Sequence, residues 1–110
     1  MADAKIGKLR EHEARILALQ IAATFPGHQA STTEIKATAP KFREWSDDDL
    51  KPSKTRGNEC MWQQILGNAV GSHQKSTVSI FAKGYAVKTR SGIRVTNKGI
   101  AMLKGKGLYA

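Results

Sequence analysis

The sequence predicts a small α+β domain, mainly α-helical, that carries a β-hairpin near its C-terminal end. Apolar residues recur at helical spacing in residues 5–24 and 58–74. Residues 85–95, in contrast, alternate apolar and polar side chains around a turn at 90–92. A chain of 110 residues is long enough for a modest core, so we expect a single domain over residues 1–110.

The first helix is expected over residues 5–24, where isoleucine, leucine and alanine make a broad apolar surface. The segment Phe25-Pro26-Gly27 should end it, because proline disfavours helical backbone at the residue before it and glycine suits a turn. Residues 28–30 can then form one short strand. No cysteine or second histidine lies at metal-ligand spacing from His28, so we expect His28 at the surface.

A second, short helix is predicted from a capping box. The Ser31 hydroxyl can accept a hydrogen bond from the backbone of Glu34, whose side chain can reach back to the backbone of Ser31. This pattern begins a helix that runs through about Thr38, with Ile35 as its buried anchor, and Pro40 should stop it.

Residues 41–54 are expected to form a linker with one notable feature, the run Ser46-Asp47-Asp48-Asp49. Three adjacent carboxylates could indicate a metal site. Adjacent residues of a helix point in different directions, however, and no spaced carboxylate or histidine follows. Ser46 as an N-cap, with the aspartates at the positive end of a helix, explains the run with fewer assumptions. We therefore expect no metal and no cofactor.

A longer helix is expected over Asn58–Gln74, with Asn58 as its N-cap. Its apolar residues share one side: Met61, Trp62, Ile65, Leu66, Ala69 and Val70. The other side is small and rich in amides: Cys60, Gln64, Gly67, Gly71 and Lys75, with Gln63, Asn68 and Gln74 flanking it. A helix that is apolar behind and amide-rich in front suits insertion into a DNA major groove. The alternative is a core helix that happens to contain two glycines.

The hairpin is predicted from the alternation of Tyr85, Val87 and Thr89 with the residues between them. Gly92 is available for a positive φ in the turn. Lys88 and Arg94 are then expected on the outer face of the hairpin, and Arg90 is expected at its tip.

A last short helix is expected over residues 97–104, capped by Thr96, with Ile100 and Leu103 turned inward and a frayed tail at 105–110. The predicted order is therefore helix, short strand, helix, linker, longer helix and β-hairpin. This is the order of a winged helix-turn-helix domain, in which the hairpin forms the wing.

The net charge of +9 is concentrated in the second half of the chain. Residues 1–49 are close to neutral, whereas no acidic residue follows Glu59. A one-sided basic surface favours a polyanion, because each phosphate that is neutralised releases counterions. No stretch is apolar enough to span a membrane, Cys60 has no partner for a disulfide, and no signal peptide is evident, so we expect a cytoplasmic protein without a membrane partner.

Particular residues resemble a known family. Asn58, Trp62, Leu66 and Ala69-Val70-Gly71, followed by Gly92-Ile93-Arg94-Val95-Thr96-Asn97-Lys98-Gly99, resemble the N-terminal winged-helix domain of Mrr-type restriction endonucleases and related modules of modification-dependent nucleases. The run Trp45-Ser46-Asp47-Asp48-Asp49-Leu50 is similar to the segment before that family's recognition helix. The resemblance covers about 29–104 and implies a DNA-recognition module whose third helix reads the target. The segment 72–83 is longer than in that family, and we expect no nuclease domain in this chain.

No catalytic constellation is predicted. Glu34-Ile35-Lys36 has the spacing of a nuclease metal site but lacks an upstream acidic partner. Ser72-His73 are sequence neighbours without an orienting acid. A phosphate-binding loop would follow a strand, and no strand is expected before Gly105-Lys106-Gly107. We therefore expect that the chain is not an enzyme.

The leading hypothesis is a duplex-DNA-binding module, either a small regulator or a restriction-type specificity module that could accompany a separate nuclease or regulatory subunit. Base contacts are expected from amides, and close approach to DNA from glycines: Gln63, Gln64 and Asn68, with Gly67 and Gly71. Phosphate contacts are expected from the linker, the helix end and the wing: Lys51, Lys54, Arg56, Lys75, Lys88, Arg90 and Arg94. The alternative is a protein-interaction winged helix with no DNA role. RNA binding is less favoured, because Trp45 and Tyr109 are isolated and Trp62 is expected to be buried.

Overall fold

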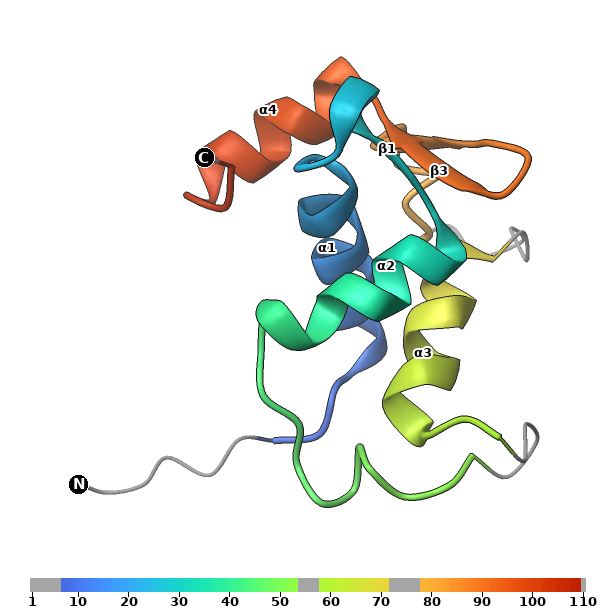
Figure 1. The fold of residues 1–110 in the computed structure, drawn as a ribbon. Helices are drawn as coiled ribbons and strands as arrows, with labels where there is room; N and C mark the ends of the chain where they lie inside the picture. The colour runs from blue at the N-terminus through green and yellow to red at the C-terminus, as the bar shows by residue number, and fades with distance from the viewer. Residues whose placement is uncertain (1–6, 54–57, 72–77, 110) are drawn as a thin grey trace.

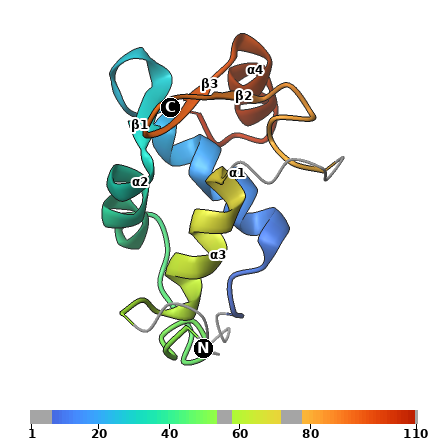
Figure 2. The same ribbon diagram turned by 90° about the vertical axis from the view of Figure 1, so that its right-hand side faces the viewer.

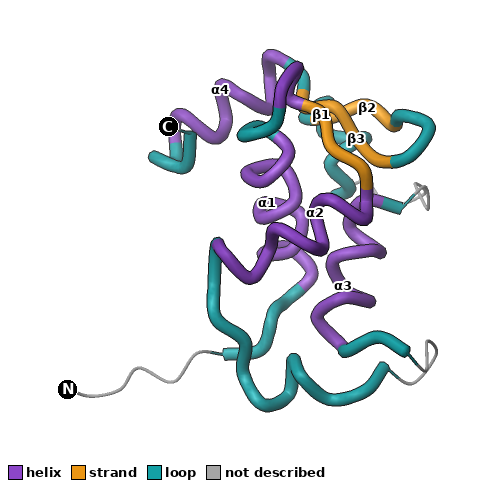
Figure 3. The backbone as a smooth tube through the Cα atoms, viewed as in Figure 1, coloured by secondary structure: helices purple, strands orange, loops and turns teal. Residues whose placement is uncertain are grey.

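The computed structural model describes residues 7–53, 58–71 and 78–109. Within these residues it is an α+β domain of helices and a small antiparallel sheet, as the sequence predicts (Figures 1 and 3). The elements in chain order are α1 (Glu11–Ala22), a 3-10 turn (Pro26–His28), β1 (Gln29–Ser31), α2 (Thr32–Thr38), a second 3-10 turn (Ala39–Lys41), α3 (Met61–Val70), β2 (Ala86–Lys88), β3 (Gly92–Val95) and α4 (Asn97–Gly105).

Helix α1 lies at the centre of the fold. It contacts α2, α3, α4 and β3, so apolar side chains are buried on several of its sides. Together with residues of the other elements, they form one hydrophobic cluster. The fully buried large side chains of this cluster are Leu9, Leu19, Ile21, Ile35, Leu66, Val70, Ile80, Ile93 and Leu103. A single continuous core of this kind holds the helices and the sheet together.

Helix α1 begins later than the sequence indicated. The predicted start at residue 5 was wrong as far as the described residues show, because Gly7–Arg10 are not helical. Hydrogen bonds of the backbone before residue 11 explain this later start. The Leu9 N–H donates to the Asp49 carboxylate at 2.7 Å, and the Arg10 N–H donates to Glu13 at 2.9 Å. Arg10 therefore serves as the N-cap, and Leu9 packs into the core from an extended segment.

The capping box before α2 is confirmed. The Ser31 hydroxyl accepts from the Glu34 N–H at 3.0 Å, and the Glu34 carboxylate accepts from the Ser31 N–H at 2.8 Å. Ile35 is completely buried, as expected. Pro40 does not end the helical backbone at once but starts a second, 3-10 turn over Ala39–Lys41. Proline fits there because the first residues of a helical turn need no donor.

The three strands form an antiparallel sheet in the order β1–β3–β2. Ala86 pairs with Val95 and Val87 with Arg94, which confirms the predicted hairpin. The side of β2 that is buried is opposite to the expected one, however. Ala86 is buried and Val87 is exposed, because Val95, the partner of Ala86, points into the core.

Gly92 has a different role from the predicted one. Its φ is not positive; the positive-φ glycines among the described residues are Gly27, Gly84 and Gly107. A Cβ at position 92 would instead lie 2.0 Å from the carbonyl oxygen of Ala30 in β1. Glycine is therefore required at position 92 because β1 crosses there at contact distance.

Helix α4 begins as predicted. The Thr96 hydroxyl accepts from the Gly99 N–H at 3.1 Å and donates to the Gly84 carbonyl at 2.6 Å. Ile100 and Leu103 are buried, which confirms the expected inward face.

The C-terminal tail contacts the rest of the chain as far as it is described, while the expected fraying at 105–110 stays a prediction. The Leu108 N–H donates to the Leu103 carbonyl at 2.8 Å. The Tyr109 hydroxyl lies 3.0 Å from Nε2 of His28. His28 is accordingly half-buried, and the structure pairs it with Tyr109, so Tyr109 is not isolated. The ring contact ties the chain end to the turn before β1.

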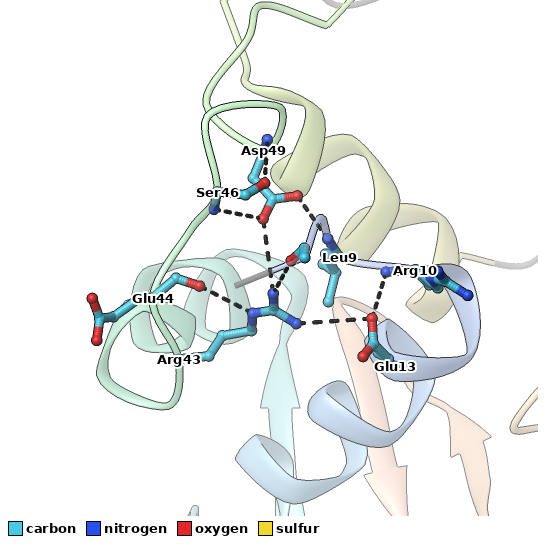
Figure 4. Close-up of polar contacts among 8 residues, drawn as sticks. Leu9, Arg10, Glu13, Arg43, Glu44, Ser46 and Asp49 are labelled. Carbon is cyan, nitrogen blue, oxygen red and sulfur yellow. Dashed lines mark hydrogen bonds and ion pairs between the residues drawn. The ribbon is translucent and has the colours of Figure 1, made fainter. Parts of the chain in front are cut away.

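Asp49 links the segment before α1 to the connection between α2 and α3 through its carboxylate (Figure 4). Asp49 is only 1% exposed. Its carboxylate accepts hydrogen bonds from the backbone N–H groups of Leu9 at 2.7 Å and Ser46 at 3.0 Å, and the Arg43 guanidinium lies 3.8 Å away. Its backbone carbonyl also accepts from the Trp62 N–H at 3.2 Å.

Arg43 extends this network to the start of α1. Its guanidinium donates to the Gly7 carbonyl at 2.9 Å and lies 4.0 Å from the Glu13 carboxylate (Figure 4). Ser46 does cap as predicted, since its hydroxyl accepts from the Asp49 N–H at 3.2 Å. The capped element is a turn over residues 47–50 and not a helix, because the same aspartate is drawn into the core.

Replacing Asp49 with alanine should destabilise the fold by about 2–4 kcal/mol, because two backbone donors and a guanidinium would lose their acceptor. Urea unfolding followed by tryptophan fluorescence measures this change. Asp47→Ala removes the same charge from an exposed position of the same turn and should shift the free energy of unfolding by less than about 0.5 kcal/mol. Equal effects of the two substitutions would contradict the role assigned to Asp49.

Candidate nucleic-acid interface

Helix α3 is shorter than the helix expected over Asn58–Gln74. It begins at Met61 with Cys60 as the N-cap residue, and Asn58 lies in a turn before it, so the predicted cap was wrong. It ends at Val70 because Gly71 adopts an extended backbone, with φ −73° and ψ 170°. Gly71 is therefore the C-cap residue and not part of the helical body.

The buried side of α3 is rotated from the predicted one. Trp62, Leu66 and Val70 are buried, whereas Met61 and Ile65 are half-exposed. The Trp62 ring stacks on Trp45 of the linker, with ring centroids 4.2 Å apart. The linker thus covers the Trp62 side of the helix, which a wheel of α3 alone could not reveal. Trp45 was expected to be isolated from other aromatic residues, and this stack shows that it is not.

The three amides proposed for base contacts differ in their availability. The Gln63 side chain accepts from the Cys60 N–H at 2.8 Å, which closes the first turn of the helix. The Gln64 side chain accepts a hydrogen bond from the buried Ser53 hydroxyl. Asn68 is exposed, and among the described residues its side chain has no hydrogen-bond partner. Asn68 is therefore the amide with both its donor and its acceptor free.

The two glycines also differ in position. Gly67 lies within α3 next to Asn68, and Gly71 lies beyond its last turn. Both are half-buried. Gly71 lines a depression beside Asn68 together with Arg15 of α1. The expectation that a DNA backbone approaches these glycines stays a prediction.

The hairpin places its basic residues on different faces. Arg90 is exposed at the tip and Arg94 on the outer face, as predicted. Lys88 pairs with Ile93, however, and therefore lies on the other face from Arg94. Its ammonium donates to the Val70 carbonyl at 3.0 Å. A cation at the C-terminal end of a helix is favourable, because the last carbonyls carry partial negative charge. The prediction that Lys88 shares the outer face was wrong.

Lys51 lies at the opposite end of α3 from the hairpin. Residues 51–53 run antiparallel to residues 59–61: Pro52 bridges Cys60, and the Met61 N–H donates to the Lys51 carbonyl at 2.8 Å. The exposed Lys51 ammonium contacts the Asp48 carboxylate at 2.9 Å. This hydrogen bond lowers the pKa of Asp48 and raises the pKa of Lys51. Three further predicted phosphate contacts lie outside the described residues: Lys54, Arg56 and Lys75.

Helix α3, the hairpin and the loop before α3 share one side of the molecule. Figure 2 shows α3 in front, with the β2–β3 hairpin above it and the loop that leads into α3 below it. The only acidic residue of the second half of the sequence, Glu59, forms an ion pair with Lys36 at 2.7 Å. This side of the described molecule therefore offers the exposed Asn68 amide, and Glu59 is neutralised by Lys36. The depression beside Asn68 is lined by one acidic and one basic residue of α1, Glu11 and Arg15.

Comparisons with family models, with curated proteins and with solved structures give no match to this chain. Among the described residues, no helix is long and apolar enough to cross a membrane. The same residues contain no group of three histidine, cysteine, aspartate or glutamate side chains that could hold a metal ion.

Proposed function

We propose that this chain is a winged helix-turn-helix module that binds duplex DNA, with α3 in the major groove and the β2–β3 hairpin as the wing. The observation that carries the proposal is the exposed Asn68 amide on α3, together with the exposed cations Arg90 and Arg94 on the hairpin that Lys88 links to the end of this helix. An asparagine amide can pair bidentately with the edge of adenine, while arginine side chains hold phosphates.

The element order supports the same proposal. A strand between the first two helices pairs with the second strand of a later hairpin, which gives the order β1–β3–β2. The hairpin is joined to the end of α3 by the Lys88 ammonium. One feature departs from a simple helix-turn-helix: residues 39–60 separate α2 from α3, where a turn of about 3–4 residues is usual. The Asp49 network and the Trp45–Trp62 stack hold this long connection against the core.

The module, in this proposal, is non-enzymatic and needs no cofactor. It acts as a small regulator or as a specificity module of the kind found at the N-terminus of Mrr-type restriction endonucleases. Base readout is assigned mainly to Asn68, because Gln63 and Gln64 already engage neighbouring groups. Phosphate contacts are assigned to Lys51, Arg90 and Arg94, with Lys54, Arg56 and Lys75 as further candidates.

Binding to a random duplex should weaken steeply with salt. If four to five phosphates are contacted, log K should fall against log salt with a slope of roughly −4, since each contact contributes about 0.9. Arg90→Ala and Arg94→Ala should each flatten that slope by about one unit for every sequence. Lys41→Ala, an exposed change on the 3-10 turn after α2, is the matched control and should leave it unaltered. Fluorescence anisotropy at three salt concentrations gives these slopes, and a duplex that does not bind at low salt rejects the proposal.

Asn68→Ala should reduce discrimination between sequences. After selection of a preferred duplex from a random pool, the variant should lose about 1–3 kcal/mol at one base pair and little elsewhere. Gln63→Ala should cost fold stability instead, since its side chain caps α3. A uniform loss over all sequences for Asn68→Ala would show that α3 does not read bases there.

Asp48→Ala should strengthen duplex binding. It releases the Lys51 ammonium, which can then meet a phosphate, and the salt slope should steepen by up to about one unit. Asp47→Ala removes the same charge from the neighbouring exposed position, but no ion pair joins it to Lys51. Anisotropy titrations compare the two variants. If both raise the affinity equally, the effect comes from net charge and Lys51 is not a specific contact.

A further inference from the structure

A second site lies along α1, next to the depression beside Asn68, with which it shares Arg15. A cavity of about 240 Å³ opens between α1, the segment 78–85 and α4. Its floor is apolar and consists of Leu19 and Ile80, which are almost completely buried. Ile16, Val78 and Met102 complete the apolar walls. The residues proposed for DNA contact do not line this cavity.

The mouth of this cavity carries positive charge without a lining carboxylate. Arg15, Lys83 and Lys106 are among its lining residues, which include no aspartate or glutamate. The two lysines are exposed and have no acidic partner among the described residues. In the described part of the chain, Arg15 forms a long ion pair of 4.0 Å with Glu11, whose side chain is 85% exposed. A long contact with a carboxylate this exposed contributes little, so Arg15 can exchange Glu11 for a better anion.

A fourth cation contacts a residue that lines the cavity. The Lys98 ammonium lies 5.7 Å from the centre of the Tyr85 ring, and Tyr85 lines the cavity. Cations that gather at an exposed surface repel one another, so an anion at the mouth would relieve this repulsion. A phosphate backbone alone would leave the partly exposed apolar walls at Ile16, Val78 and Met102 in water. The arrangement therefore calls for a ligand with both an anionic head and an apolar body.

We propose that this cavity binds a small amphipathic anion, an alkyl or aryl carboxylate, with its apolar body against Leu19 and Ile80 and its carboxylate between Lys83 and Lys106. The volume lies below the roughly 300–1,000 Å³ of sites for drug-sized ligands, which limits the ligand to on the order of ten non-hydrogen atoms. For a ligand of this size, we expect a dissociation constant on the order of 1 mM or tighter. The proposal stands independently of DNA binding.

Octanoate, octylamine and acetate test the proposal on the whole chain. Titration followed by two-dimensional NMR of backbone amides and methionine methyls should show saturable shifts with octanoate at Ile80, Tyr85 and Met102. Octylamine carries the wrong charge and acetate lacks the apolar body, so both should bind at least fivefold more weakly. Equal binding of octanoate and octylamine, or shifts confined to other parts of the chain, would overturn the assignment.

A pair of double variants tests the role of the cations. Lys83→Ala with Lys106→Ala should weaken octanoate binding at least fivefold. Lys41→Ala with Lys104→Ala removes the same charge from positions that do not line the cavity and should change it less than twofold. All four lysines are exposed, so both proteins should fold. Similar losses in the two proteins would reduce the effect to net charge and defeat the proposal.

Discussion

The placement of α3 depends on one buried carboxylate. Asp49 lies between the segment before α1 and the first turn of α3, and its side chain and backbone bind both. A carboxylate loses much of its hydration when it is buried, so it is stable there only if donors replace the water. Two backbone N–H groups and the Arg43 guanidinium supply that replacement. The long connection between α2 and α3 consequently has a defined path, although it contains little regular structure.

The contacts of Asp49 show the difference between parts of the structure that depend on nearby residues, which could be predicted from sequence, and parts that depend on distant residues, which could not. Elements defined by nearby residues were predicted well: the Ser31–Glu34 capping box, the Thr96 cap and the hairpin around residues 90–92 all depend on groups a few positions apart. The start of α1 depends on Asp49, forty positions away, and no local pattern contains that partner. The acidic run did contain a signal, because Ser46 and Asp49 have capping-box spacing. It was compatible with a helix as much as with a turn.

The candidate interface was predictable in composition and less so in orientation. The amide-rich side of α3 and the basic hairpin follow from residue types and periodicity. Residue types and periodicity do not show which amide is free. Gln64 accepts a hydrogen bond from Ser53, and Gln63 accepts one from the Cys60 backbone. Both donors lie in the loop before the helix. The face of Lys88 was missed for a related reason. Strand alternation gives two faces, and only the partner strand decides which one meets the core. The apolar cavity along α1 combines residues from three separate segments and has no signature in the sequence.

The strand order has a consequence for how the chain reaches its fold. β1 at Gln29–Ser31 has its only described strand partner in β3 at Gly92–Val95, so the sheet cannot close until almost the whole domain has been synthesised. Until then β1 presents unpaired backbone groups while α1 and α2 can already pack together. Closing so long a loop costs entropy before any pairing is gained, which slows the formation of the sheet relative to the helices. Nascent chains that pause before residue 92 would thus hold a helical subdomain with an open strand, a state that other chains could capture by edge pairing.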